Sequence, residues 1–230
     1  MNKRISCFLP CRKGSERVLN KNTRKFAGYE FGLTEIKLNQ LLKTQLIDEI
    51  VLSTNDESII EYARKMNDKR IRLHIRDASL AQGTTSTDQL VSHAIDLIPN
   101  GHILWTHVTS PFISNNIYDK IISDYFKKLK EGYDSLMTVT EIQSFLWKNN
   151  TPLNYNRKLE KWPRTQTLDT IQHINSGAFI ASTKIYDDYE DRIGLNPFLY
   201  SLNKNISHDI DWMDDFILAE CMLEKGIVKI

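Results

Sequence analysis

The sequence predicts an α/β fold with a mainly parallel sheet, and three observations support this. Apolar runs typical of strands alternate with amphipathic, helix-like segments over residues 5–140. The run Ile50-Val51-Leu52 is unbroken, as expected of a strand buried on both faces. The first apolar run, Ile5 to Pro10, ends directly in a basic turn. Repeated strand–helix–strand units of this kind form a parallel sheet covered by helices.

The elements follow one another in a regular order. Strands are predicted at residues 5–10, 48–54, 70–76, 102–108, 134–140 and 173–182. Helices are predicted at 31–43, after a cap at Asp56, after hydroxyl caps within 84–87, from 117 to a stop at Gly132, and at 184–191. A last helix is predicted to bury Trp212, Phe216, Ala219 and Leu223.

The regular alternation of predicted strands and helices stops after Thr140. Residues 141–170 contain Pro152, Pro163, several asparagines and scattered aromatic residues, without a helical stripe. We therefore predict a nucleotide-binding core at 1–140, an extended β-rich arm at 141–170, and completion of the core by 171–230. The arm has too few apolar residues to stand alone, so we expect it to pack on a partner as a dimerisation element.

Composition excludes several classes of protein. The 230 residues are 41% hydrophobic and 26% charged, which is ordinary globular usage, and the net charge is +1. A chain built to coat nucleic acid would carry a basic excess. The sequence has no apolar run of membrane-spanning length and no targeting signal, and its cysteines (Cys7, Cys11 and Cys221) fit no disulfide framework. These features favour a cytoplasmic protein that binds neither nucleic acid nor membrane.

The basic turn after the first strand is a candidate phosphate site. Ligands of open α/β sheets bind beyond the carboxyl ends of the strands, where this turn falls. Gly14 permits a tight turn, Ser15 offers a hydroxyl, and Arg12 and Lys21 offer charge-assisted hydrogen bonds. The Gly-Lys-Ser/Thr ending of a Walker loop is absent. Taken alone, the turn is equally compatible with a solvated basic loop.

The segment "SHDIDWMDD" adds a candidate metal site. If residues 207–211 are extended, Asp209 and Asp211 share one face with Cα atoms about 6.5–7 Å apart, while His208, Ile210 and Trp212 face the core. Two such carboxylates favour a bound Mg²⁺ beside a polyphosphate. The alternative, capping of the following helix, is assigned to Asp214 and Asp215.

These residues resemble a known family. "LPCRKGSERVLNKN" is similar to the N-terminal signature of the CMP-sialic acid synthetases (acylneuraminate cytidylyltransferases), Pro-x-Arg-x-Gly-Ser followed by Lys-Asn. The similarity continues through "VLSTND", "RDASLAQGTTSTD", "HVTSP", "NSGAFI" and "DID" in the family's order, and so covers nearly the whole chain. It implies a Rossmann-like three-layer fold of the nucleotide-diphospho-sugar transferase type, and a homodimer whose arm reaches the other subunit's sugar site.

The resemblance also implies roles for individual residues. Arg12 and Lys21 would hold the phosphates of CTP, with Ser15 and Asn22 lining the nucleotide pocket beside Gly14, and with Arg76, Thr85, Ser86 and Thr87 near the cytosine and ribose. The sugar acid would meet His107, Thr109 and Ser110, the arm residues Arg164 and Gln166, and the segment Asn175, Ser176 and Gly177. Asp209 and Asp211 would hold Mg²⁺.

The implied reaction is attack of a sugar acid's anomeric hydroxyl on the α-phosphate of CTP, which releases pyrophosphate. Arg12, Lys21 and Mg²⁺ would stabilise the growing negative charge. The general base stays open between a metal-bound water and Asp211. Two rival functions also stay open: transfer to another sugar acid, such as a KDO-type sugar, and an inactive nucleotide-sugar-binding homologue. Paired metal carboxylates argue against the inactive homologue.

Four departures from the family pattern bear on specificity. Cys11 stands in place of a common alanine, and Glu16-Arg17 in place of Lys-Gly. Gly83 replaces a common acidic residue, and His107 replaces the more usual glutamine. A histidine at 107 can still donate a hydrogen bond, although it also fits selection of a different sugar acid.

Overall fold

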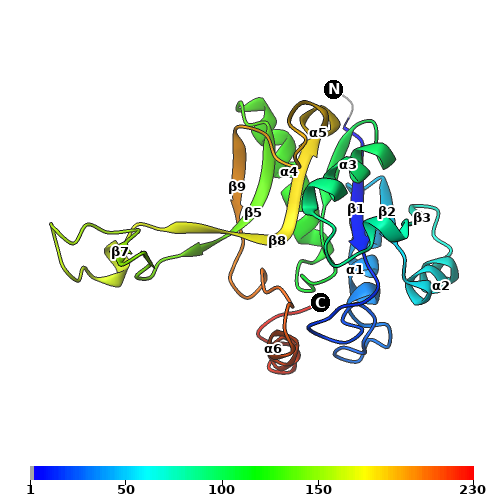
Figure 1. Ribbon diagram of the computed structural model, residues 1–230, viewed down its shortest axis with the longest axis horizontal. Helices are drawn as coiled ribbons and strands as arrows, with labels where there is room; N and C mark the ends of the chain where they lie inside the picture. Colours follow the sequence, from blue (N-terminus) through cyan, green and yellow to red (C-terminus); the bar gives the residue numbers. More distant parts are fainter. Residues whose placement is uncertain (1–2) are drawn as a thin grey trace.

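The protein is a three-layer α/β body with one long projection (Figure 1). The computed structural model describes residues 3–230. Its seven-stranded sheet has the order β3-β2-β1-β4-β8-β5-β9. β8 runs antiparallel to both of its neighbours, β4 and β5, and the other pairings are parallel. The predicted α/β class with a mainly parallel sheet is confirmed.

The elements have the following bounds. The strands of the sheet are β1 (Ile5–Cys11), β2 (Glu49–Thr54), β3 (Ile71–Ile75), β4 (His102–Trp105), β5 (Ser135–Ile142), β8 (Ile171–Ser182) and β9 (Pro197–Ser201). The helices are α1 (Gly32–Lys43), α2 (Glu57–Met66), α3 (Thr87–Leu97), α4 (Asn115–Lys130), α5 (Thr183–Tyr189) and α6 (Met213–Glu224), with short 3₁₀ turns η1 (Ala78–Leu80) and η2 (Thr165–Thr167).

Alternation along the strands creates two cores. In β1 the residues Cys7 and Leu9 face a core shared with α1, α2, α4 and α6, whereas Phe8 faces a core shared with α3 and α5. The unbroken run in β2 divides in the same way, since Ile50 and Leu52 belong to one core and Val51 to the other. Burial on both faces explains why these strands read as continuous apolar runs.

Local signals placed most helix starts correctly. The Asp56 side chain accepts a hydrogen bond from the Ser58 N–H at the start of α2, and Ser86 forms a capping box with Gln89 at the start of α3. At the start of α6, the Asp215 carboxylate accepts hydrogen bonds from the backbone N–H groups of Asp211 and Trp212. The expected capping role of Asp215 is therefore confirmed.

Three expectations were wrong. Trp212 is 58% exposed rather than core-facing, because it precedes α6 as the N-cap residue and its indole lies against Arg17, with the guanidinium 5.1 Å from the ring centroid. The strand predicted at 102–108 ends at Trp105, since residues 106–110 form a loop. The strand β9 was not predicted; its residues are only half-buried at the edge of the sheet, so they lack a strong apolar run.

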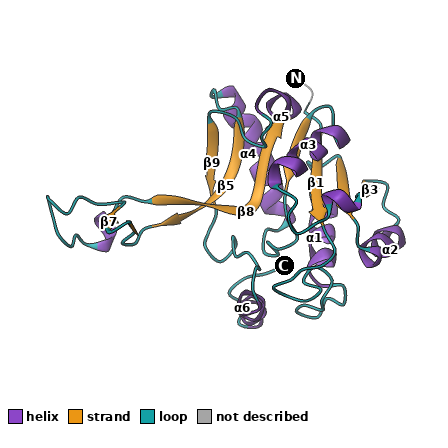
Figure 2. Ribbon diagram, in the orientation of Figure 1, coloured by secondary structure: helices purple, strands orange, loops and turns teal. Residues whose placement is uncertain are grey.

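The predicted arm is present as a projection. β5 and β8 continue past the edge of the body, and the chain between them carries only the two-residue strands β6 (Trp147–Lys148) and β7 (Thr151–Pro152) and the turn η2 (Figure 2).

Within residues 3–230, no helix combines the length and apolar character needed to cross a membrane.

Candidate active site

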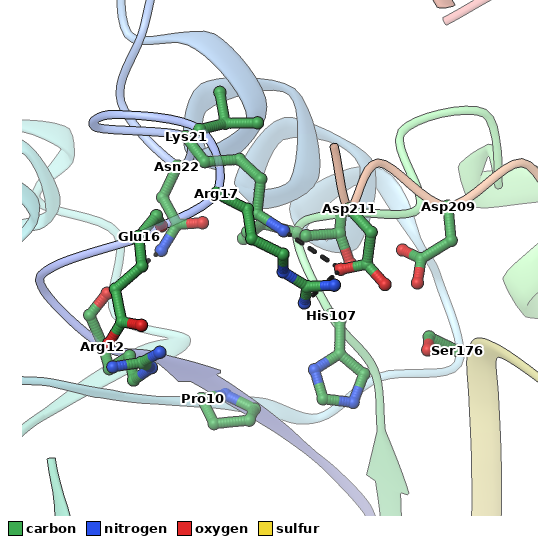
Figure 3. A pocket seen from close by; sticks show the side chains of 14 residues that line it. Pro10, Arg12, Glu16, Arg17, Lys21, Asn22, His107, Ser176, Asp209 and Asp211 are labelled. Atoms are coloured by element: carbon green, nitrogen blue, oxygen red, sulfur yellow. Dashed lines mark hydrogen bonds and ion pairs between the residues drawn. The ribbon is translucent and has the colours of Figure 1, made fainter. Parts of the chain in front are cut away.

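A pocket of about 410 Å³ opens where β1 and β4 end at their carboxyl edge. Four segments distant in sequence form it: the basic turn with the end of β1, the loop after β4, Ser176 of β8, and the segment before α6 (Figure 3). Its lining residues are Pro10, Arg12, Ser15, Glu16, Arg17, Val18, Lys21, Asn22, His107, Val108, Thr109, Ser176, Asp209 and Asp211. The structure thus brings together nine of the residues predicted for the site, at the edge where parallel sheets bind ligands.

The basic turn has a defined shape. Gly14 has φ +82°, a left-handed conformation that favours glycine, so the tight turn expected there is present. Val18 is buried in the core, and the Lys21 N–H donates to the Val18 carbonyl at 3.1 Å. The Asn22 amide donates to the Arg12 carbonyl at 3.2 Å. These anchors keep the turn folded across the strand end.

The strongest electrostatic feature of the pocket centres on Asp211. Its Oδ1 lies 3.3 Å from Lys21 Nζ and 2.9 Å from a guanidinium nitrogen of Arg17. The Lys21 side chain is almost buried, and its Nζ also donates to the Ile210 carbonyl at 2.7 Å. The residues predicted for the site do not include Arg17, although it shares the Asp211 carboxylate with Lys21. Its position in the basic turn was the available signal.

Asp209 contributes a buried carboxylate oxygen to the site. Its Oδ1 is buried and has no hydrogen-bond partner among the described residues. A buried carboxylate oxygen without a partner is costly, and hard cations such as Mg²⁺ prefer oxygen ligands. Residues 3–230 contain no group of three or more His, Cys, Asp or Glu that could hold a metal by themselves. Asp209 and Asp211 therefore fit a cation that takes its other ligands from a substrate and water.

Buried groups of α1 support the floor of the pocket. Lys37 Nζ donates to the Ser110 carbonyl at 2.8 Å and to the Tyr118 hydroxyl at 2.7 Å, and Gln40 Nε2 donates to the Pro111 carbonyl at 2.6 Å. Burial lowers the pKa of Lys37 to about 7. Nothing in the sequence predicted that this lysine would be fully buried.

The floor in turn holds the acidic segment. The backbone N–H of Ile210 donates to the Thr109 carbonyl at 2.9 Å, which joins the loop after β4 to the segment that carries Asp209 and Asp211. Lys37 and Gln40 fix the carbonyls of the two residues that follow Thr109. The spacing of the two aspartates thus depends on contacts that reach back to α1.

His107 lies in the pocket as an uncharged imidazole. Burial, followed by the positive charges of Arg192, Lys37 and Lys21, lowers the pKa of His107 to about 3. The indole N–H of Trp105 donates to His107 Nε2 at 3.0 Å. The side chain can therefore serve the pocket as an uncharged hydrogen-bonding group at neutral pH.

A second cavity of about 760 Å³ adjoins the first at the base of the arm. It shares Ser176, Asp209 and Asp211 with the first pocket. The rest of its lining combines hydroxyl, amide, apolar, basic and acidic groups: Thr140, Glu141, Ile142, Gln143, Ser144, His173, Ile174, Asn175, Lys204, Ser207 and His208. The two cavities form a path from the basic turn to the arm.

Some residues predicted for the site have structural partners. Arg76 is buried and donates to the side chain and carbonyl of Ser53. The side-chain oxygen Oδ1 of Asn175 accepts from Thr138 Oγ1 and from the Gly177 N–H. An added Cβ at Gly177 would lie 2.7 Å from the Ile113 side chain, so a larger residue there would force its neighbours to shift. Ser110 is buried, and its carbonyl binds Lys37.

Other predicted residues lie apart from the pocket. Ser86 is occupied as the cap of α3, Thr85 lies in the loop that follows η1, and Thr87 is the first residue of α3. Arg164 and Gln166 lie at η2 on the arm and line neither cavity. Within one chain, the structure does not bring them to the pocket.

The departure at Gly83 has a counterpart nearby. A Cβ added to Gly83 would lie 3.0 Å from Glu16 Oε1 and 3.7 Å from a guanidinium nitrogen of Arg12. Glu16 thus places a carboxylate where residue 83 has no side chain. The two departures, Glu16 and Gly83, occupy one location beside Arg12.

Comparison with known proteins identifies the family. Residues 6–192 match the family model described as "Cytidylyltransferase". The chain belongs to the cytidylyltransferase family. Members of this family are nucleotidyltransferases, so the protein is an enzyme of that class. The pocket of cations and carboxylates at the sheet edge lies partly within the matched residues and partly beyond them, at Asp209 and Asp211.

Curated relatives of this cytidylyltransferase share most of its length. A pseudaminic acid cytidylyltransferase from Campylobacter jejuni subsp. jejuni serotype O:23/36 is 28% identical, over 94% of this chain and 94% of the relative. An N-acylneuraminate cytidylyltransferase from Escherichia coli O18:K1:H7 is 22% identical over 98% of this chain, but only 53% of the relative is covered.

Solved structures of low sequence identity share the fold. A CMP:2-keto-3-deoxy-manno-octonic acid synthetase complexed with CTP is 12% identical with a TM-score of 0.66, and the match covers 97% of this chain and 100% of that one. A 4-diphosphocytidyl-2C-methyl-D-erythritol synthase from Anaerococcus prevotii is 17% identical with a TM-score of 0.69, over 96% of each chain. These neighbours confirm the nucleotide-diphospho-sugar transferase type of fold.

Proposed function

We propose that this cytidylyltransferase joins the cytidylyl group of CTP to a nonulosonic acid of the pseudaminic or sialic type. The products are a CMP-sugar acid and pyrophosphate. The observation that carries this proposal is the pocket in which Arg12 and Lys21 lie beside Asp209 and Asp211, with a second cavity adjoining it. The relative that matches this chain along 94% of both lengths is named for pseudaminic acid, which supports that sugar type.

The basic turn would bind the triphosphate. Arg12, Arg17 and Lys21 all line the pocket, and Lys21 is held rigidly by its bonds to Ile210 and Asp211. A fixed cation costs little reorganisation when negative charge grows on the α-phosphate and on the leaving pyrophosphate. Positioning and charge neutralisation account for most of the catalysis in phosphoryl transfer. Arg12 and Lys21 are therefore the proposed catalytic cations.

The two aspartates would hold Mg²⁺ together with the substrate. The unpartnered Oδ1 of Asp209 supplies the chemical reason, because a cation would satisfy it. When bound, Mg²⁺ would neutralise charge on the phosphates. Asp211 would also keep Lys21 and Arg17 in place through its Oδ1.

The second cavity would hold the sugar acid. It reaches the first pocket at Ser176 and the aspartates, so a sugar there would present its anomeric hydroxyl to a nucleotide in the first pocket. Lys204 and His173 offer positive or hydrogen-bonding partners for a carboxylate, and Ile142 and Ile174 offer apolar surface for acyl or deoxy groups. This mixed lining suits an N-acylated sugar acid.

The test is pyrophosphate release from CTP and Mg²⁺ with pseudaminate, N-acetylneuraminate, legionaminate or KDO, and with the other nucleoside triphosphates as controls. We expect release with CTP and a nonulosonic acid, and little with KDO. Turnover of KDO alone would replace the proposed substrate class. If no sugar acid gives pyrophosphate release while calorimetry detects CTP binding, the result would favour the inactive nucleotide-binding homologue instead.

A further inference from the structure

The end of β4 contains a pair of side chains that the proposed mechanism leaves unassigned. Trp105 is 1% exposed and belongs to the core beneath α3 and α5, whereas His107, two residues later, lines the pocket (Figure 3). The indole nitrogen of Trp105 lies 3.0 Å from His107 Nε2. A core residue thus contacts a pocket residue through one directed hydrogen bond.

The chemistry of the two groups fixes the proton on His107. An indole N–H can only donate, so Nε2 of His107 must be the acceptor and carries no proton. A neutral imidazole has one N–H, which is then at Nδ1. Nδ1 of His107 has no hydrogen-bond partner among the described residues. It is not among the buried atoms that lack a partner either, so it is accessible in the pocket that His107 lines. Nδ1–H is therefore open to the pocket.

Arg192 supports this arrangement from the other side. Its guanidinium lies 3.7 Å from the ring centroid of Phe179 and 5.1 Å from that of Trp105. Stacking of this kind fixes both the cation and the indole. The positive charge close to His107 opposes a second proton on the imidazole, as do the charges of Lys37 and Lys21.

We propose that Trp105 is a positioning residue that locks His107 in its Nδ1–H tautomer, so that His107 acts as a fixed hydrogen-bond donor. This inference rests on the proposed function for the identity of the acceptor, an oxygen of the phosphates or of the sugar acid. With Nε2 occupied by Trp105 and Nδ1 already protonated, His107 has no free lone pair. It cannot accept the proton of the attacking hydroxyl, which must go to another group.

The direct test is the tautomer of His107 in the free protein, which needs no substrate. Two-bond ¹H–¹⁵N correlation spectra of ¹⁵N-histidine-labelled protein distinguish the two neutral tautomers and the imidazolium, and the His107→Gln variant assigns the signals. We expect a protonated Nδ1 and an unprotonated Nε2 at pH 7. A protonated Nε2, or an imidazolium, would overturn the proposal.

The Trp105→Phe variant tests the cause of the lock. We expect signals from the Nε2–H tautomer to appear in this variant, since the indole donor is gone while an aromatic ring remains. Trp147→Phe, on the arm and 40% exposed, is the matched control and should leave the His107 signals unchanged. An unchanged tautomer in folded Trp105→Phe protein would show that Trp105 does not set it. If this variant does not fold, the wild-type spectrum still decides whether Nε2 is protonated.

Kinetic measurements with a sugar acid that the enzyme turns over distinguish a hydrogen-bond donor from a general base at His107. The amide of His107→Gln can accept from Trp105 and donate to the substrate, but it cannot act as a base, so we expect a loss below about tenfold in kcat/KM. His107→Leu removes the donor and should lose about ten- to hundredfold. Loss of about 10²–10⁴ in the Gln variant would be the result for a general base and would contradict the proposal. Absence of turnover in wild-type protein would count against the proposed function, while the tautomer would still be measurable.

Discussion

The strand-end pocket and the arm differ in whether their contacts are made within one chain. In the pocket, Lys21 and Asp211 meet although 190 positions separate them, because buried strands end at a common edge. In the arm, large apolar side chains remain exposed: Leu159 at 86%, Trp162 at 64% and Leu153 at 54%. Arg164 and Gln166 stay outside both cavities. The contacts that hold the pocket are made within one chain, whereas the arm leaves large apolar side chains uncovered.

This difference shows which groups a single chain holds in place by itself. The pocket's charged groups are held by core anchors such as Val18 and Lys37, so their geometry belongs to the folded protomer. The arm has an aromatic cluster of its own, in which Phe145 packs edge-on against Tyr155 and Trp162, but no covering layer. Exposed apolar surface of this extent favours a protein partner, and a second copy of this chain is the partner that we propose.

The largest expected effect comes from breaking the pocket at Lys21. Lys21→Ala should lower kcat for pyrophosphate release by about 10²–10³, as does loss of one preorganised charge-stabilising donor in other enzymes. Lys25→Ala is the matched control, since Lys25 lies outside the pocket and pairs with Glu30. Circular dichroism should show both variants folded. A loss of less than threefold in Lys21→Ala would mean that the turn is only a solvated basic loop.

The arm is tested next, by complementation. If Arg164 serves the partner's site, Arg164→Ala should lose about ten- to hundredfold in activity, as expected for a charge-assisted contact. Mixing it with inactive Lys21→Ala should restore part of the activity in heterodimers, because one site then receives both intact residues. A clean monomer by light scattering at micromolar concentration, or no recovery after mixing, would confine the site to one chain.

Removal of the Asp209 carboxylate should act on metal-dependent binding. We expect Asp209→Ala to weaken CTP binding in the presence of Mg²⁺ by about tenfold, with little change when Mg²⁺ is replaced by EDTA. Isothermal calorimetry measures both conditions without turnover. Equal affinities of the variant and the wild type in Mg²⁺ would remove Asp209 from the proposed metal site.

The buried Lys37 should leave a pH signature on stability. Its folded pKa of about 7 lies below the unfolded value of 10.5, so the unfolded chain binds more protons between these values. Stability should therefore rise with pH above 7, by at most about 1.4 kcal/mol per pH unit. Urea unfolding at pH 7.0 and 8.5 measures the slope, and Lys37→Met should flatten it. Identical slopes in the two proteins would mean that Lys37 keeps its ordinary pKa.

The smallest expected effect concerns the cap that precedes α6. Asp215→Ala removes the acceptor for the N–H groups of Asp211 and Trp212 and should cost about 1 kcal/mol, or about 2–4 °C in Tm. Asp214→Ala, at an exposed position of the same helical turn, is the control and should change Tm by less than 1 °C by the usual size of surface effects. Equal Tm shifts for the two variants would contradict the capping role.

The sequence by itself determined the order of most strands and helices along the chain, the strand-end position of the basic turn, and the presence of two aspartates from the end of the chain in the pocket. Such features follow from local periodicity, glycine at a left-handed turn and capping side chains, which depend on neighbours in sequence. For the same reason the weakly apolar edge strand β9 was missed, and Trp212 was assigned to the core from local periodicity alone.

Only the tertiary structure decided which groups share a partner. The ion pair of Arg17 with Asp211, the bond from Trp105 to His107, and the burial of Lys37 under the pocket all join segments or faces whose approach no local pattern encodes. The sheet order places these groups within hydrogen-bonding distance, and burial then sets their protonation. Distances of a few ångströms decide such interactions, and only packing of the whole chain fixes those distances.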